Sequence, residues 1–183
     1  MRWITVSVLA LCLGGPAMAA DGFRFASIDG GEIDLSDWAG KPVLVVNTAS
    51  LCGCAGQFDG LQTLHDRFGD QALILAVPSN DFEQELASEA EVKEYCAMTF
   101  DITLPMTEIT HVRGPEAHPF YDWVKAEAGF VPGWNFNKVL VGRDGRIKAI
   151  FGAGDEPQGP KITQAIATEL AARIEVVASI LAF

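Results

Sequence analysis

Two uninterrupted apolar runs stand out along the chain. Val43–Val46 is apolar and mostly β-branched, and Ala72–Val77 is equally apolar until Pro78 ends it. A strand that is covered on both faces shows such a continuous run, whereas a strand with one wet face alternates. The two runs therefore predict buried central strands at 43–48 and 72–77.

Other stretches predict further strands. Residues 23–35 alternate apolar and polar positions around the turn signal Asp29–Gly31, which indicates a β-hairpin. The strand 139–141 and its partner 146–151 flank a second turn, and Leu104–Ile109 fits a short strand. The predicted sheet is therefore mixed, with a hairpin at its N-terminal end.

Helical spacing of apolar residues predicts four helices, near 57–69, 89–99, 118–128 and 160–181. Ser88 and Glu91 form a capping box, and Pro119 suits the first turn of a helix. One face of the last helix is apolar at Ile162, Ile166, Leu170, Ile174 and Val177. The alternation of strands and helices predicts an α/β fold, with helices on both faces of a mixed sheet.

The beginning of the chain has the pattern of a cleaved export signal. Arg2 precedes the apolar stretch Ile4–Leu13, and Ala17–Ala19 fits a cleavage site. The apolar stretch is too short to span a bilayer as a helix. We expect residues 1–20 to be a bacterial signal peptide, 21–183 to be one mature domain, and the location to be periplasmic or secreted.

The composition suits one acidic globular domain. The chain has 183 residues, of which 49% are hydrophobic, and this is enough for a well-packed core. Its formal charge of −11 becomes −12 when Arg2 is removed with the signal. An acidic chain without a basic stripe disfavours nucleic acids and anionic membranes as partners. We expect neither of these partners and no membrane span.

Three cysteines remain in the mature chain: Cys52, Cys54 and Cys96. Disulfides persist in the oxidising compartments that exported proteins reach, and an odd number of cysteines indicates at least one free or functional thiol. Cys52 lies between a strand and a helix, where free N–H groups and the helix dipole favour the nucleophilic thiolate. On this stretch alone, an ordinary small loop residue explains Cys52 equally well.

Three motifs closely resemble those of glutathione peroxidases. Lys41–Gly53 is similar to the family's peroxidatic motif, Pro78–Glu85 to a variant of its second motif, and Trp134–Val141 to its third. Phe25–Gly40 resembles the opening hairpin of the family. These segments follow the family's order over about residues 23–170. The resemblance implies a thioredoxin-like fold and peroxidase activity.

The resemblance also implies roles for single residues. The catalytic tetrad of the family falls on Cys52, Gln84, Trp134 and Asn135, and its resolving cysteine falls on Cys96. Cys52 would reduce the peroxide and become a sulfenic acid, which Cys96 would convert into a disulfide. The amide and indole N–H groups would stabilise the developing charges. The short segment before Trp134 resembles that of monomeric members, so we expect a monomer.

The second motif departs from the family pattern. Asp81 replaces the usual glutamine, Leu86–Ala87 replaces proline–glycine, and one residue is missing before Gln84. Cys54 is an additional thiol. A disulfide between Cys52 and Cys54 would be strained. Cys54 is therefore either an alternative resolving thiol or a small residue without a role.

Each supporting residue taken alone also has a structural explanation. Trp134 suits a core aromatic, Asn135 a turn, Gln84 a solvated loop, and Cys96 an inert buried thiol. The three histidines, His65, His111 and His118, have no partner at metal-ligand spacing. We expect no metal and no other cofactor.

Three functions compete. A thiol peroxidase would reduce hydrogen peroxide or organic hydroperoxides, with a thioredoxin-like protein or a low-molecular-weight thiol as reductant. A disulfide exchanger would use Cys52 and Cys54, although exchangers show C-x-x-C and this chain has C-x-C. A copper carrier would combine thiolates with Met98 or Met106. The three motifs in family order favour the peroxidase.

Overall fold

The computed structural model describes residues 19–180, with side chains described as far as residue 172 except that of Asp21. The predicted signal peptide therefore lies almost wholly outside the described residues. A short 3-10 helix, η1 (Ala20–Gly22), leads into the predicted hairpin of β1 (Arg24–Ala26) and β2 (Glu32–Asp34). A second 3-10 helix, η2 (Leu35–Trp38), connects the hairpin to the central sheet.

The central sheet has four strands in the order β4-β3-β5-β6. Their bounds are β3 (Val43–Thr48), β4 (Leu73–Pro78), β5 (Lys138–Val141) and β6 (Ile147–Phe151). β3 pairs in parallel with β4 and antiparallel with β5, which pairs antiparallel with β6. The predicted mixed sheet is confirmed.

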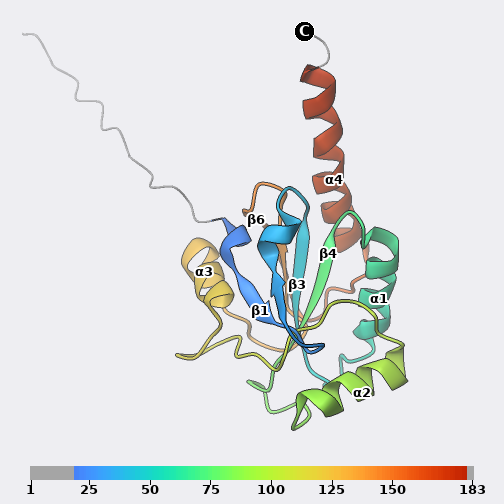
Figure 1. Cartoon of the computed structure of the whole chain (residues 1–183), viewed down its shortest axis with the longest axis vertical. Helices are drawn as coiled ribbons and strands as arrows, with labels where there is room; N and C mark the ends of the chain where they lie inside the picture. Colours follow the sequence, from blue (N-terminus) through green and yellow to red (C-terminus); the bar gives the residue numbers. More distant parts are fainter. Residues whose placement is uncertain (1–18, 181–183) are drawn as a thin grey trace, which may run out of the picture.

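Four helices cover this sheet: α1 (Gln57–Phe68), α2 (Glu89–Phe100), α3 (Pro119–Ala128) and α4 (Pro160–Ile180). Figure 1 shows α3 beside one face of the sheet and α1 and α4 beside the other. Ser88 Oγ accepts a hydrogen bond from Glu91 N at 3.4 Å, so the predicted cap begins α2. The predicted α/β arrangement of helices around a mixed sheet is confirmed.

The apolar side chains of β3 belong to two hydrophobic cores, one on each face of the sheet. Leu44 and Val46 belong to a core shared with α1, α2 and α4, whereas Val43 and Val45 belong to one shared with α3 and the hairpin. Successive side chains of a strand point to opposite faces, so a strand between two helical layers has no polar face.

The apolar face of α4 continues the first of these cores. Ile162 and Ile166 are buried in it, and Leu170 is partly buried against it. The side chains of Ile174 and Val177 lie outside the described residues.

The segment Leu104–Ile109 does not form the expected strand. It makes two isolated bridges, Met106 with Ala76 of β4 and Thr107 with Ser27 beside β1. Pro105 accepts a hydrogen bond from Ala76 through its carbonyl, but it has no N–H with which to continue a ladder. The segment therefore joins the hairpin to the edge of the sheet without being a strand of it.

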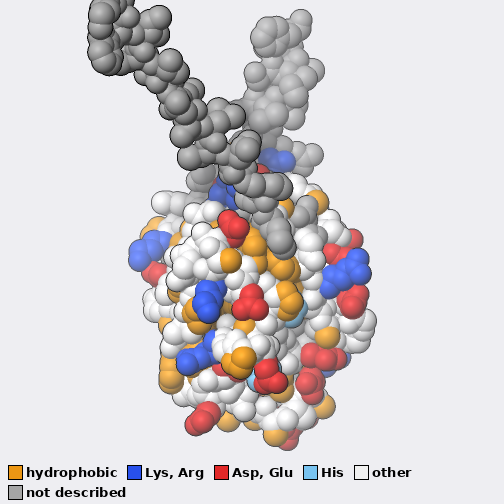
Figure 2. All heavy atoms as spheres, turned by 90° about the vertical axis from the view of Figure 1, so that its left-hand side faces the viewer, with side chains coloured by type: hydrophobic (Ala, Val, Ile, Leu, Met, Phe, Trp, Pro, Cys, Tyr) orange, Lys and Arg blue, Asp and Glu red, His pale blue; other side chains and the backbone are white. Residues whose placement is uncertain are grey.

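On the face in Figure 2, acidic and basic side chains lie scattered among apolar ones. Among the described residues, none of the helices combines the length and the apolar character needed to cross a membrane.

We expect Leu44→Ala to lower the free energy of unfolding by about 2–5 kcal/mol, because it leaves a cavity in the core between the sheet and its helices. Leu44 is 0% exposed, whereas Leu51 is 59% exposed and offers the same substitution at the surface. Leu51→Ala should change stability by no more than about 0.5 kcal/mol. Urea unfolding followed by circular dichroism measures both, and equal losses would contradict the core assignment.

Candidate active site

Cys52 lies in the loop between β3 and α1, with its side chain buried. Its carbonyl accepts a hydrogen bond from Ala55 N at 2.9 Å, and its Sγ accepts one from Cys54 N at 3.4 Å. Turns at residues 53–56 separate Cys52 from the first residue of α1, Gln57. The nearest N–H donor to this sulfur therefore comes from its own turn and not from the helix end.

Gln84 lies in the loop between β4 and α2. Its carbonyl accepts a hydrogen bond from the backbone N–H of Leu51, the residue before Cys52, at 2.9 Å. Glu83, directly before Gln84, has a φ of 58°, a left-handed conformation that costs energy in a residue other than glycine. The loop is therefore bent at Glu83 and bonded at Gln84, next to the cysteine loop.

Trp134 and Asn135 lie in the turn that leads into β5, and Asn47 of β3 holds this turn. Asn47 Nδ2 donates to Trp134 O at 3.0 Å, and Asn47 O accepts from Phe136 N at 2.6 Å. Asn47 Oδ1 accepts from Asn137 N at 3.1 Å. One strand residue therefore bonds to three of the four residues Trp134–Asn137.

The structure brings Asn135 and Gln84 into direct contact. Asn135 is buried, and its Nδ2 donates to Gln84 Oε1 at 3.0 Å. Asn135 Oδ1 has no hydrogen-bond partner among the described residues. Since Gln84 in turn bonds to Leu51, hydrogen bonds join three segments that are distant in the sequence. Their link to Cys52 runs through its neighbour Leu51.

Trp134 is not a core aromatic, because 45% of it is exposed. Its ring lies against that of Phe82, with 5.5 Å between the ring centroids, and the Arg113 guanidinium covers Phe82 at 5.2 Å. The Trp134 indole is therefore at the surface, beside the loop that carries Gln84.

Asp81, where this chain departs from the family motif, ties the same loop to residues 111–113. Its Oδ2 accepts hydrogen bonds from Val112 N at 2.6 Å and Arg113 N at 3.1 Å. Its Oδ1 lies 2.7 Å from His111 Nδ1, and this hydrogen bond raises the pKa of His111. Asp81 therefore fastens the segment that places Arg113 over Phe82.

Cys54 faces a buried lysine. Burial and then the neighbouring Cys52 raise the pKa of Cys54, and the charge of Lys138 opposes this rise. Lys138 Nζ donates to Gln57 Oε1 and to Asp155 O, both at 2.6 Å. Burial lowers the pKa of Lys138 to about 8. The lysine holds the start of α1 to the loop before α4.

Cys96 lies on α2, buried in the same apolar core to which Cys52 belongs. Burial, and then the charge of Glu85, raise the pKa of Cys96 to about 12. All three described cysteines are free thiols.

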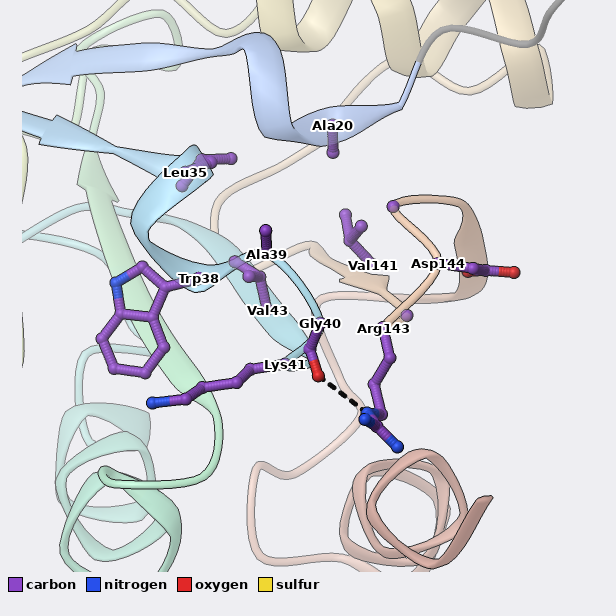
Figure 3. Close-up of a pocket in the computed structure, with 12 residues that line it drawn as sticks. Ala20, Leu35, Trp38, Ala39, Gly40, Lys41, Val43, Val141, Arg143 and Asp144 are labelled. Carbon is purple, nitrogen blue, oxygen red and sulfur yellow. Dashed lines mark hydrogen bonds between the residues drawn. The ribbon is translucent and has the colours of Figure 1, made fainter. Parts of the chain in front are cut away.

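A cavity of about 230 Å³ lies at the other end of the sheet (Figure 3). Val43, the first residue of β3, lines it, whereas Cys52 follows the last. Its basic side chains are already bonded: Arg143 Nε donates to Gly40 O at 2.7 Å, and Lys41 Nζ to Asp70 O at 3.0 Å. The cavity is therefore separate from the residues around Cys52.

Comparison with known proteins decides the family. The family model described as glutathione peroxidase matches residues 22–125, more than half of the chain. A glutathione peroxidase of Lactococcus lactis subsp. cremoris is 41% identical over 142 residues, covering 74% of this chain and 90% of that relative. The chain belongs to the glutathione peroxidase family. The protein is accordingly an oxidoreductase with peroxidase activity.

Two further relatives are similar to this chain over most of its length. The hydroperoxy fatty acid reductase gpx1 of Synechocystis is 38% identical over 148 residues, covering 74% of this chain and 88% of the relative. The thioredoxin/glutathione peroxidase BtuE of Escherichia coli is 34% identical over 170 residues, covering 79% and 93%.

Solved structures confirm the thioredoxin-like fold of this glutathione peroxidase. The crystal structure of Trgpx in apo form superposes with a TM-score of 0.67 at 30% identity, covering 85% of this chain and 97% of that one. A thioredoxin-family thiol:disulfide interchange protein from Chlorobium tepidum superposes with a TM-score of 0.62 at 15% identity, covering 86% and 99%. The second likeness concerns the fold alone.

Three residues with contacts at or near the site were not expected from the sequence: Asn47, Glu85 and Lys138. Asn47 and Lys138 are polar residues within otherwise apolar strands, and all three are buried. A buried polar side chain needs partners, so a polar residue inside an apolar run is the signal that would have marked Asn47 and Lys138.

We expect His111→Gln to destabilise this glutathione peroxidase more at pH 5.5 than at pH 9. The pKa of His111 is raised above 6.5 by Asp81, so the stabilisation is fully present below that pH and is lost as the pH rises through the folded-state pKa. Because the His111 side chain is exposed, the effect should be below about 1 kcal/mol. Urea unfolding at both pH values measures it. Glu116 Oε2, 3.8 Å from His111 Nε2, also raises this pKa but is a smaller cause than Asp81. A pH dependence that Asp81→Asn leaves undiminished would therefore contradict the pairing.

Proposed function

We propose that this protein is an exported two-cysteine peroxidase, in which Cys52 reduces the peroxide and Cys96 resolves the sulfenic acid. The observation that supports this most is the chain of hydrogen bonds from Asn135 to Gln84 and from Gln84 to Leu51, next to Cys52. These two hydrogen bonds join all three motif segments at one place. A set of unrelated surface residues would have no reason to meet there.

In the first step, the Cys52 thiolate attacks a peroxide oxygen. An S–O bond forms, the O–O bond breaks, and water or an alcohol leaves, so the sulfur is oxidised to a sulfenic acid. Gln84 Oε1 is occupied by Asn135, which leaves the Nε2 hydrogens of Gln84 as donors for charge on sulfur or oxygen. The exposed Trp134 supplies a further donor through its indole N–H.

In the second step, Cys96 forms a disulfide with Cys52 and water leaves. A disulfide needs Cα atoms within about 7 Å of each other. Val92 and Cys96 are the fully buried residues of α2. A helix held by few buried side chains opens at a low free-energy cost, which allows Cys96 to approach Cys52.

The surface around Cys52 suits organic as well as inorganic peroxides. Leu51 and Trp134 are large exposed apolar residues, and Phe82 lies against Trp134. The name of the Synechocystis relative points to fatty acid hydroperoxides. The name of the Escherichia coli relative points to thioredoxin, so we propose a thioredoxin-like protein as the reductant of the disulfide. The signal at 1–20 would place the reaction in the periplasm or outside the cell. We also propose that the enzyme is a monomer.

We expect Cys52→Ser to abolish peroxide consumption, because no other thiol occupies its place beside Gln84. Cys96→Ser should lose thioredoxin-driven turnover while a single equivalent of peroxide is still reduced. Peroxide consumption by the mature chain, with thioredoxin and its reductase or with glutathione, measures this. Cys54→Ser is the matched control and should retain turnover. Full thioredoxin-driven activity in Cys96→Ser would contradict the resolving role.

Trp134→Phe tests the indole N–H, because it keeps an aromatic ring against Phe82. We expect the rate constant for oxidation by hydrogen peroxide to fall about 10- to 100-fold, as when one hydrogen bond to a charged group is lost. Stopped-flow measurement with excess peroxide gives this rate. Trp38→Phe makes the same change at the cavity of Figure 3, at the other end of the sheet, and should leave the rate unchanged. An unchanged rate in Trp134→Phe would exclude the indole as a donor.

A further inference from the structure

An exposed cation contacts the aromatic pair beside the candidate site. The Arg113 guanidinium lies 5.2 Å from the ring centroid of Phe82, and the ring centroids of Phe82 and Trp134 are 5.5 Å apart. Arg113 is exposed, Phe82 is half-buried, and 45% of Trp134 is exposed. The two rings therefore form an apolar surface that begins at Trp134 and carries a positive charge at Phe82.

This positive charge has no carboxylate partner within the part of the chain that the structure describes, where the Arg113 side chain forms no ion pair. Asp81 instead accepts hydrogen bonds from the backbone N–H groups of Val112 and Arg113. His111 lies against the other oxygen of Asp81 and 3.8 Å from the Glu116 carboxylate. The guanidinium is therefore available to a carboxylate from outside the protein, which it can bind through two parallel hydrogen bonds.

Arg113 also lines a hollow of about 220 Å³, together with other residues of its loop and with α3. Lys125 and Asp122 of α3 add one charge of each sign to this lining, so the hollow keeps the net positive charge of Arg113. Val131, which is 42% exposed, adds apolar surface. The hollow therefore gives a carboxylate room beside the guanidinium.

We propose that Arg113 binds the carboxylate of a long-chain organic hydroperoxide whose apolar chain lies on Phe82 and Trp134. The inference rests on the proposed function, in which Cys52 reduces the peroxide. Chain carbons that cover the two rings remove apolar surface from water, and the ion pair at Arg113 fixes the end of the chain. Arg113 is then a specificity-determining residue, which favours anionic over neutral organic hydroperoxides. Hydrogen peroxide has neither a chain nor a carboxylate, so this selection concerns organic substrates alone.

The hydroperoxide of linoleic acid and its methyl ester test this role, because the ester keeps the chain and removes the charge. The kcat/KM of the mature chain is measured for each substrate with thioredoxin and its reductase. The wild-type chain should prefer the acid. Arg113→Gln should lower the ratio of acid to ester about tenfold, as expected when a hydrogen bond to a charged group is lost. The ester rate of the same variant reports any general damage to the enzyme.

Arg67→Gln is the matched control. Arg67 is also exposed and lies over a ring, 4.7 Å from the centroid of Phe68, but in the last turn of α1. This variant should keep the wild-type ratio of acid to ester. Arg113→Lys keeps the charge without the forked donors, so it should retain part of the preference.

Several results would overturn the inference. They are a wild-type ratio near one, a ratio that Arg113→Gln leaves unchanged, and a ratio that Arg67→Gln lowers equally. A wild-type chain that reduces hydrogen peroxide but neither organic substrate would overturn it as well. If the wild-type chain reduces none of the three peroxides, or if Cys52→Ser reduces them equally well, it is the proposed function that fails.

Discussion

The candidate site depends on the hydrogen bonds of one strand residue, Asn47. It is the fifth residue of the central strand β3, and it bonds through its backbone and both side-chain ends to the turn before β5. This turn includes Phe136, whose φ of 59° is costly for an aromatic residue and requires support from its surroundings. Asn47 provides this support because it lies in β3, which is paired on both sides. It thereby places Asn135 where it can bond to Gln84.

The fold contributes to this site mainly by burying polar groups in a paired state. Lys138 and Asn135 are both fully buried, and each has specific partners: Gln57 and Asp155 for the lysine, and Gln84 for the asparagine. Removing such groups from water is costly unless they are hydrogen-bonded, so each fixes the relative position of two segments. The relative positions of the segments at the site are therefore fixed by contacts that add little net stability.

Much of the fold could be predicted from local patterns. The continuous apolar run predicted β3 at Val43–Thr48. The capping box and Pro119 placed the starts of α2 and α3 within about a residue, because these features depend on neighbours in the sequence. Leu104–Ile109 was predicted wrongly, since its apolar residues fit a strand while Pro105 interrupts the ladder. Pro105 is visible in the sequence and would have counted against a strand there, as Pro78 ended the strand before it.

The sequence pointed to residues that the structure brings together, but not to the contacts between them. The family motifs pointed to Gln84 and Asn135, yet their hydrogen bond joins positions 51 residues apart. Glu85 lies within the second motif, but its burial could not be predicted, because a glutamate in a polar loop is usually solvated. Only the fold shows that Glu85 is buried and that its charge raises the pKa of Cys96.

Burial of Cys96 also affects how readily it reacts with peroxide compared with Cys52. A thiol with a pKa of about 12 reacts slowly with peroxide, since peroxide is attacked by the thiolate. In the proposed reaction, this burial would protect Cys96 from the peroxide that Cys52 reduces. The same burial would make it a poor partner for the sulfenic acid. In the proposed second step, the opening of α2 that carries Cys96 to Cys52 would also end this burial.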